Sequence, residues 1–153
     1  MLSVKTKEEI ESLLTEAKYG RFCSHNKDGT IHVTPVWFRY GNGQIIVVTP
    51  EAGRKARNVR RDNRVTILVD ISGGEAGSRG VTIYGKAELE PQNSPTADAI
   101  FWAEKYWPKD KAERYVEAMC KLTNLVKIAI KPERLALFDY SKDATYHRAI
   151  QEV

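Results

Sequence analysis

The sequence predicts a mainly β (α+β) fold, in which antiparallel strands form a closed or nearly closed barrel and short helices pack outside it. Three observations favour this class. Some seven short segments are rich in β-branched and apolar residues, glycine-containing turns separate several of them, and the amphipathic helical segments between them are brief. Short strands broken by turns in this way are typical of barrels.

One domain, spanning residues 1–153, is expected from the length. At 17.3 kDa the chain is large enough to bury a core without disulfides or metal. Hydrophobic residues make up 42% and charged residues 29%, which excludes a disordered or fibrous protein. No internal repeat, low-complexity segment or interdomain linker is found.

The first element is an amphipathic helix over residues 7–18. Thr6 is the predicted N-cap, and Glu9 three residues later completes a capping box. The apolar residues recur at helical spacing, so that one face carries Ile10, Leu13, Leu14 and Ala17. The helix is expected to stop near Gly20.

Three antiparallel strands are predicted next, over residues 20–26, 31–40 and 45–49. The Asp28-Gly29 pair between the first two is expected to supply the positive φ angles of a tight turn. A second turn, GNGQ at 41–44, leads into the third strand.

The second half of the chain adds four strands and a helix. Residues 64–70 and 79–89 are β-branched strands around a loop at 72–78, and residues 108–122 form a helix whose apolar face is Tyr115, Met119 and Leu122. Residues 126–140 are predicted to form two strands, separated at Lys131–Pro132.

Residues 53–64, GRKARNVRRDNR, contain six basic side chains, with Asp62 as the only acid. Thr49 and Pro50 just before them predict the N-cap and first residue of a short helix. Its apolar stripe is Ala52, Ala56 and Val59.

Arg54 and Lys55 would then lie at a helix N-terminus, where free N–H groups and the helix dipole favour a phosphate. The C-terminal end of the same helix suits the remaining cations without any ligand; these are Arg60, Arg61 and Arg64. Two alternatives stay open at this point: a solvated helix face, and a nucleic-acid-binding surface. The second is less favoured because no exposed aromatic residues alternate with the basic ones.

Three segments together carry a family resemblance: TPVWFRY, the run KARNVRRDNRVTILVD from Lys55 to Asp70, and VTIYGKAEL. Over residues 5–140 the chain resembles the FMN-binding split-barrel family related to pyridoxamine 5′-phosphate oxidase. It looks closest to the branch that includes flavin- or deazaflavin (F-420)-dependent oxidoreductases. The resemblance implies a split barrel of six to seven antiparallel strands. It also implies a homodimer with two cofactor clefts at its interface.

The resemblance implies bound FMN or, alternatively, the deazaflavin coenzyme F-420. The residues matched to the phosphate segment are Thr49, Arg54 and Lys55, with Arg57 and Asn58 nearby. The strand along the ring is matched by Val33, Thr34, Pro35, Val36 and Trp37. Because the bound ring performs the hydride chemistry, no side-chain catalyst is expected.

The expected function is therefore an oxidoreductase that transfers a hydride to or from a small organic substrate. The alternatives are a non-catalytic flavin- or haem-binding protein and, less favoured, a basic nucleic-acid-binding module. The chain ends YHRAIQEV, without the Arg-rich signature of the true oxidase, so a different substrate is expected.

The aromatic residues of the sequence leave several interpretations open. Trp37 is either a core residue or a stacking partner of the cofactor. Trp102 and Trp107, which lie among Phe101 and Tyr106, are packing residues, dimer contacts or the roof of a substrate pocket. Tyr84 in VTIYG is similarly ambiguous.

No metal site or catalytic nucleophile is predicted. The three histidines, His25, His32 and His147, lack metal-ligand spacing, and Cys23 and Cys120 are expected to be buried free thiols. The charged N-terminus is unlike a signal peptide, and no apolar run is long enough to cross a membrane. A cytoplasmic protein with no membrane or nucleic-acid partner is expected.

Overall fold

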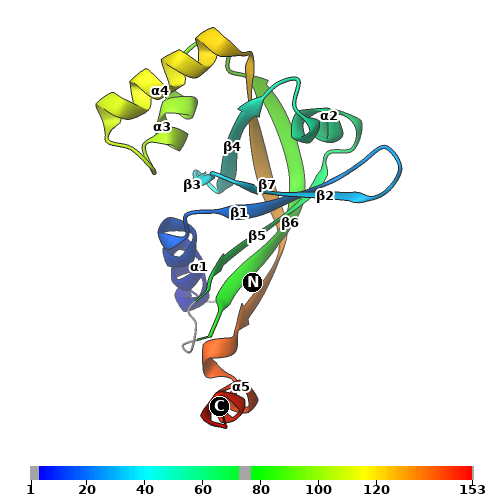
Figure 1. Ribbon diagram of the computed structural model, residues 1–153, viewed down its shortest axis with the longest axis vertical. Helices are drawn as coiled ribbons and strands as arrows, with labels where there is room; N and C mark the ends of the chain where they lie inside the picture. The colour runs from blue at the N-terminus through cyan, green and yellow to red at the C-terminus, as the bar shows by residue number, and fades with distance from the viewer. Residues whose placement is uncertain (1–3, 73–76, 153) are drawn as a thin grey trace.

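The computed structural model describes residues 4–72 and 77–152 (Figure 1). Its seven strands are β1 (Gly20–His25), β2 (Ile31–Val36), β3 (Arg39–Gly41), β4 (Gln44–Pro50), β5 (Arg64–Ile71), β6 (Arg79–Pro91) and β7 (Leu125–Asp139). The α-helices are α1 (Val4–Glu16), α2 (Arg54–Arg61), α3 (Ala97–Ala103), α4 (Lys109–Leu122) and α5 (Ala144–Gln151), and a 3₁₀ helix, η2 (Tyr140–Lys142), precedes the last. The predicted mainly β class is confirmed.

All seven strands belong to one antiparallel sheet in the order β2-β1-β5-β6-β7-β4-β3. Its two edge strands, β2 and β3, follow one another in the chain but do not pair with each other. The sheet therefore does not close, and the barrel is split between them. The predicted single strand over 31–40 is therefore wrong. The chain leaves the sheet at Trp37 and Phe38, where the Phe38 N–H donates to the Tyr106 hydroxyl instead of to a neighbouring strand.

The two predicted turns differ in their backbone. Asn42 and Gly43 both have positive φ, 51° and 73°, as a tight primed turn requires. In the first hairpin only Gly29 is left-handed, with φ 83°. Asp28 acts through its carboxylate instead, which accepts hydrogen bonds from the N–H and the hydroxyl of Thr30.

The last strand, β7, is continuous, so the predicted break at Lys131–Pro132 is wrong. Tyr84 pairs with Arg134 and Gly85 with Pro132, which leaves Glu133 as the extra residue of a β-bulge. A Cβ at position 85 would lie 2.2 Å from the Lys131 carbonyl oxygen. Glycine at this position therefore lets the two backbones approach closely enough for the strand to continue past Pro132.

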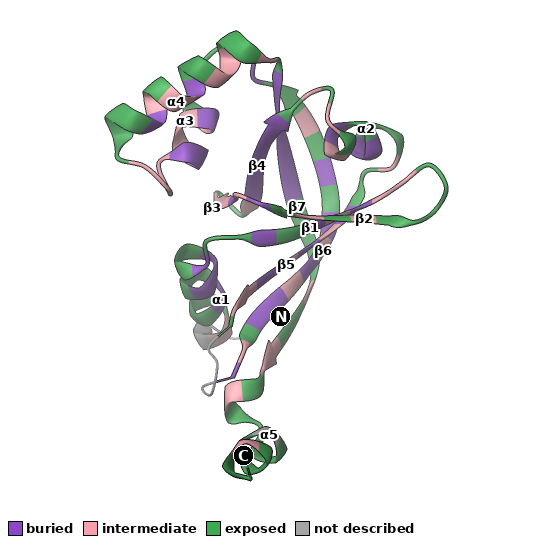
Figure 2. Ribbon diagram, in the orientation of Figure 1, coloured by how far each residue is buried: buried purple, intermediate pink, exposed green. Residues whose placement is uncertain are grey.

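Two apolar cores lie on the two sides of β4, which is buried on both faces (Figure 2). Ile45 and Val47 point into the barrel, where the α1 face predicted from the sequence also packs. Ile46 and Val48 face α3 and α4. These two helices lie together at one end of the sheet, and α5 lies at the other (Figure 1).

Several helix predictions need correction. Thr6 lies inside α1, so it is not the N-cap. Leu122 is 81% exposed, because α4 turns Ala112 and Val116 inward and leaves Tyr115 and Met119 partly buried. The predicted loop at 72–78 lies partly outside the described residues.

The Thr49 cap is also wrong. Thr49 and Pro50 continue β4, because they pair with Val126 and Leu125 of β7. Consequently α2 begins only at Arg54, with Gly53 as its N-cap. Ala52 precedes the helix and is exposed, so it does not join the apolar stripe.

Candidate functional site

A cavity of about 220 Å³ opens beside the bend after β2. It gathers five of the ten predicted cofactor residues: Pro35, Val36, Trp37, Thr49 and Lys55. The other lining residues are Val47, Val48, Trp102 and Tyr115. A larger groove of about 460 Å³, on the outer face around Tyr84, contains none of the ten.

The polar end of the cavity is formed by Thr49 and Lys55. Thr49 is only 5% exposed, yet its hydroxyl has no hydrogen-bond partner among the described residues. Lys55 is half-buried and likewise has no ion pair in that part of the chain, and burial lowers the pKa of its ammonium group. A hydroxyl that is accessible from the cavity and has no partner, beside an uncompensated cation, favours an anionic group in the cavity.

Helix α2 adds its N-terminal backbone to this end. Its first intrahelical bond runs from the Arg57 N–H to the Gly53 carbonyl oxygen, at 3.1 Å. The N–H groups of Arg54, Lys55 and Ala56 therefore have no helical acceptor, and together with the helix dipole they favour negative charge.

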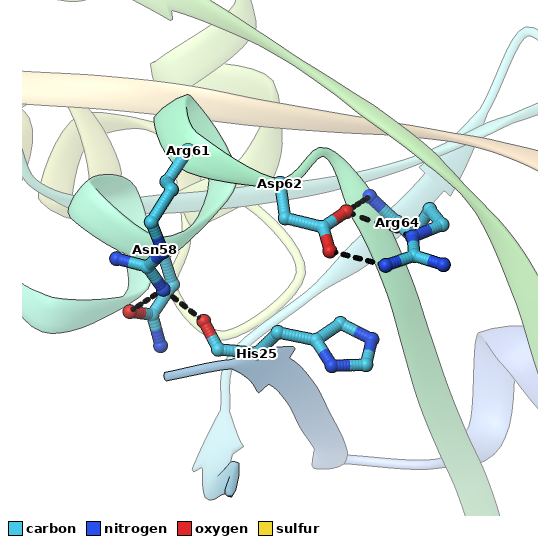
Figure 3. A network of polar contacts seen from close by, with 5 residues as sticks. All are labelled: His25, Asn58, Arg61, Asp62 and Arg64. Carbon is cyan, nitrogen blue, oxygen red and sulfur yellow. Dashed lines mark hydrogen bonds and ion pairs between the residues drawn. The ribbon is translucent and has the colours of Figure 1, made fainter. Parts of the chain in front are cut away.

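The C-terminal half of the basic segment is already satisfied within the chain (Figure 3). Arg61 donates to the His25 carbonyl oxygen and, at 2.9 Å, to the side-chain oxygen of Asn58. Arg64 pairs with Asp62 at 2.6 Å, and this hydrogen-bonded pair lowers the pKa of Asp62. Arg60 pairs with Glu51 at 3.1 Å. These three arginines need no ligand.

The other half of the predicted site residues do not line the cavity; they are Val33, Thr34, Arg54, Arg57 and Asn58. Val33 points outward and is 55% exposed. Asn58 is buried and holds α2 on the first hairpin, donating to Ser24 Oγ at 3.1 Å and Asn26 Oδ1 at 3.0 Å. Arg54 and Arg57 are exposed, and neither has an ion pair among the described residues.

An aromatic wall closes the opposite side of the cavity. Trp37 stacks on Tyr106, with ring centroids 4.3 Å apart and planes 10° from parallel. Trp102 donates from its indole N–H to the Trp37 carbonyl oxygen at 3.1 Å. The ring centroids of Tyr115 and Trp37 are 5.9 Å apart. Tyr115 was not among the residues predicted for the site, because its spacing in the sequence indicated only a helix face.

Comparison with known proteins shows the family of the chain. The family model of pyridoxamine 5′-phosphate oxidase matches residues 6–138. The chain belongs to this family. A search of curated proteins found no match.

Several solved structures have the same fold as this member of the pyridoxamine 5′-phosphate oxidase family. A conserved hypothetical protein from Mycobacterium tuberculosis is 25% identical, with a TM-score of 0.72 over 92% of this chain and 86% of that one. A protein titled F-420 reductase is 22% identical, with a TM-score of 0.63 over 82% and 94%. A FAD-binding protein from Mesorhizobium loti is 23% identical, with a TM-score of 0.61 over 89% and 92%.

In this member of the pyridoxamine 5′-phosphate oxidase family, Tyr106 and Lys105 hold the bend that carries Trp37. The Tyr106 hydroxyl accepts from the Phe38 N–H and lies 2.8 Å and 3.0 Å from the carbonyl oxygens of Phe38 and Lys18. Burial raises its pKa to about 12. Lys105 donates to the Leu14 carbonyl oxygen at 2.9 Å and lies 3.6 Å from the Phe38 ring centroid. Burial lowers the pKa of Lys105 to about 8.

No metal-type cluster of His, Cys, Asp or Glu occurs in the described residues of this family member. Within the same residues, no helix is long and apolar enough to span a membrane. Cys23 and Cys120 are free thiols, as predicted, but both are only partly buried.

Proposed function

We propose that this protein is an oxidoreductase that binds FMN, or alternatively the deazaflavin coenzyme F-420, and transfers a hydride to or from a small organic substrate. The observation that carries the proposal is the unpartnered pair of Thr49 and Lys55 at the polar end of the cavity. Family membership supports it, and two proteins of the same fold are titled F-420 reductase and FAD-binding protein.

The residues present fit a phosphorylated flavin or deazaflavin. Lys55, the Thr49 hydroxyl and the first N–H groups of α2 would bind its phosphate, with Arg54 at the outer side. Residues 33–36 lie in the edge strand β2, whose outer N–H and C=O groups face no other strand of the described sheet and would bind the polar edge of a ring. Trp37, Trp102 and Tyr115 would cover apolar ring surface and exclude water.

When bound, the flavin or deazaflavin supplies the hydride chemistry itself. The protein's part is binding, orientation and exclusion of water, for which no side-chain acid or nucleophile is required. We further propose a homodimer, in which a second copy covers the open side of the split barrel.

Titration of the purified protein with FMN, F-420 and riboflavin tests the proposal. We expect FMN or F-420 to bind at micromolar levels with a change in ring fluorescence, and riboflavin, which lacks the phosphate, to bind more weakly. If neither phosphorylated compound binds, while haem or a duplex oligonucleotide does, the proposal is overturned.

A further inference from the structure

A polar group without a partner also lies on the aromatic side of the cavity. Tyr115 lines the cavity, and its hydroxyl makes no hydrogen bond among the described residues. In that part of the chain the only buried side-chain polar atom without a partner is the indole nitrogen of Trp107, so the Tyr115 hydroxyl is accessible. Burial of the ring raises the pKa of Tyr115, and the hydroxyl therefore keeps its proton at neutral pH. It is available as a hydrogen-bond donor on the wall opposite Lys55.

Two other donors of the aromatic cluster are already used within the chain. The Trp102 indole N–H donates to the Trp37 carbonyl oxygen, and the Tyr106 hydroxyl contacts the backbone of Phe38. The indole N–H of Trp37 has no acceptor among the described residues, and Trp37 lines the cavity as well. The aromatic wall therefore offers two donors to a bound molecule, the Trp37 N–H and the Tyr115 hydroxyl.

The side chains that line the cavity are donors without a single carboxylate. Each polar one can donate a hydrogen bond; these are Trp37, Thr49, Lys55, Trp102 and Tyr115. Asp, Glu, His, Asn and Gln are absent from the lining set. An amine substrate would bring an ammonium group, and its oxidation would give an iminium cation, but the cavity holds no anion to pair with either. It suits an uncharged substrate whose polar atoms accept hydrogen bonds.

We propose that this cavity binds a conjugated carbonyl compound as the hydride acceptor, and that Tyr115 holds its carbonyl oxygen by a hydrogen bond. The inference rests on the proposed function, since it names the substrate class and the direction of hydride transfer. The hydride, supplied by the bound flavin or deazaflavin, forms a bond to the β-carbon of the substrate. The π electrons of the C=C bond shift toward the oxygen, and a proton from solvent completes the reduction at the α-carbon. Tyr115 keeps its own proton throughout.

The chemistry of hydride addition explains why the wall carries donors. An isolated C=C bond has no atom to take up the charge of an added hydride, whereas in a conjugated carbonyl compound this charge passes to the oxygen. A donor at the oxygen therefore stabilises the transition state more than the bound substrate. The flat rings of Trp37 and Trp102 fit the planar conjugated part of such a molecule. Lys55 and Thr49 remain assigned to the phosphate, so the two groups of donors have separate ligands.

Infrared difference spectroscopy of conjugated cyclohexenone, isotopically labelled at the carbonyl carbon, tests the hydrogen bond without turnover. The protein is loaded with oxidised FMN or F-420, which has no hydride to transfer, so the ligand stays intact. We expect the carbonyl band to lie at lower frequency on wild-type protein than on Tyr115→Phe. The Kd for cyclohexenone should be about twofold to tenfold higher in this variant, because one hydrogen bond between neutral groups is lost. The affinity for FMN or F-420 should change little.

Anaerobic reoxidation of the loaded, reduced protein by cyclohexenone measures the hydride transfer itself. The single-turnover rate constant should fall about a hundredfold in Tyr115→Phe, since the lost donor faces charge that develops in the transition state. Tyr84→Phe, on the outer groove, is the matched control and should keep the wild-type band and rate constant. Cyclohexene, which lacks the oxygen, should not reoxidise the reduced protein, and cyclohexylamine should not reduce the oxidised protein.

Three outcomes overturn this inference alone. The first is an identical carbonyl band and rate constant in wild type and Tyr115→Phe. The second is a loaded, reduced wild-type protein that cyclohexenone does not reoxidise, and the third is reduction of the loaded, oxidised protein by cyclohexylamine. If wild-type protein binds neither FMN nor F-420, the proposed function fails as well.

Discussion

Lys55 and Arg60 are cations of the same helix with different surroundings. Lys55 lines the cavity without a partner, whereas Arg60 pairs with Glu51. Lys55→Ala should weaken FMN binding by about tenfold to a hundredfold, because a charge-assisted hydrogen bond contributes about 1.5–3 kcal/mol. Arg54→Ala should also weaken it, and Arg60→Ala should change it little. Equal losses in all three variants would contradict the site and favour a delocalised polyanion surface.

Replacing the Thr49 hydroxyl should affect stability and FMN binding differently. Thr49→Val should change the free energy of unfolding of the ligand-free protein little, since the hydroxyl that is removed makes no hydrogen bond among the described residues. FMN affinity should nevertheless fall about twofold to tenfold. Thr66→Val, on the outer groove, is the matched control and should affect binding little. Unchanged FMN affinity in Thr49→Val would remove this residue from the site.

At the scale of elements, the bend between β2 and β3 depends on the segment between α3 and α4. Tyr106→Phe keeps the ring stacked on Trp37 but leaves the Phe38 N–H without its acceptor. We expect a loss of about 1–3 kcal/mol in the free energy of unfolding, measured by urea denaturation. Tyr115→Phe is the control, because the Tyr115 hydroxyl has no hydrogen bond among the described residues. Similar losses in both variants would argue against a special role for Tyr106.

Lys105 gives the contact between α1 and the Phe38 bend a pH dependence. Its pKa is about 8 in the folded chain, below the ordinary value of 10.5, so the unfolded chain binds more protons between these two pH values. The free energy of unfolding should therefore gain a rising component from pH 8 to pH 10. Lys105→Met should lack this component, whereas Lys111→Met, which removes a similar contact with Trp107, should retain it. If the free energy of unfolding depended on pH in the same way in wild type and in Lys105→Met, this role of Lys105 would be refuted.

For the whole molecule, the proposed homodimer now has a candidate surface. From the sequence, dimer contacts were one interpretation of Trp102 and Trp107, and Tyr84 in VTIYG was similarly ambiguous. Trp102 and Trp107 contribute to the packing around Trp37 within one chain. Edge strand β2 instead exposes Ile31 and Val33, at 52% and 55%. An apolar unpaired edge of this kind favours association with another chain.

Light scattering should therefore give about twice the chain mass of 17.3 kDa. The double variant Ile31→Glu/Val33→Glu should give the mass of one chain and weaker FMN binding. Leu122→Glu, which alters an exposed leucine at the end of α4, should remain dimeric. A wild-type monomer that binds FMN at micromolar concentration would contradict a cleft shared between two chains.

Local patterns predicted most of the sheet, because β-branched residues and turn residues act through their immediate neighbours. Non-local partners decided the rest. The break after Val36 depends on a hydroxyl 68 residues away from Phe38. β7 continues past Pro132 because a bulge forms opposite Gly85. Thr49-Pro50 has the local pattern of a helix start, but pairing with β7 overrides it.

The candidate site was only partly predictable for the same reason. The basic segment and the strand before Trp37 are visible in sequence, and residues of both reach the cavity. Lys55 differs from Arg61 in being partly buried and without a partner among the described residues. Neither the burial nor the partners of a cation can be deduced from a run of basic residues. Trp102 of α3 and Tyr115 of α4 line the cavity because of how these helices pack on the sheet. Helical spacing in the sequence shows which residues share a face, but not what that face packs against.

The position of α3 and α4 in the chain has an evolutionary consequence. Pro91 and Val126 are paired neighbours at the ends of β6 and β7, so the 92–124 segment between them is an excursion from a single hairpin. It can change in length or sequence without altering the order of the sheet, provided that it keeps Tyr106 on Phe38 and the apolar cover of Ile46 and Val48. Because it supplies Trp102 and Tyr115, one wall of the cavity is free to diverge while β4 and α2 keep the anion-binding end fixed. Descendants of one ancestor could thus acquire new substrates by exchanging this segment alone, and grafting it between homologues is a direct route to altered specificity.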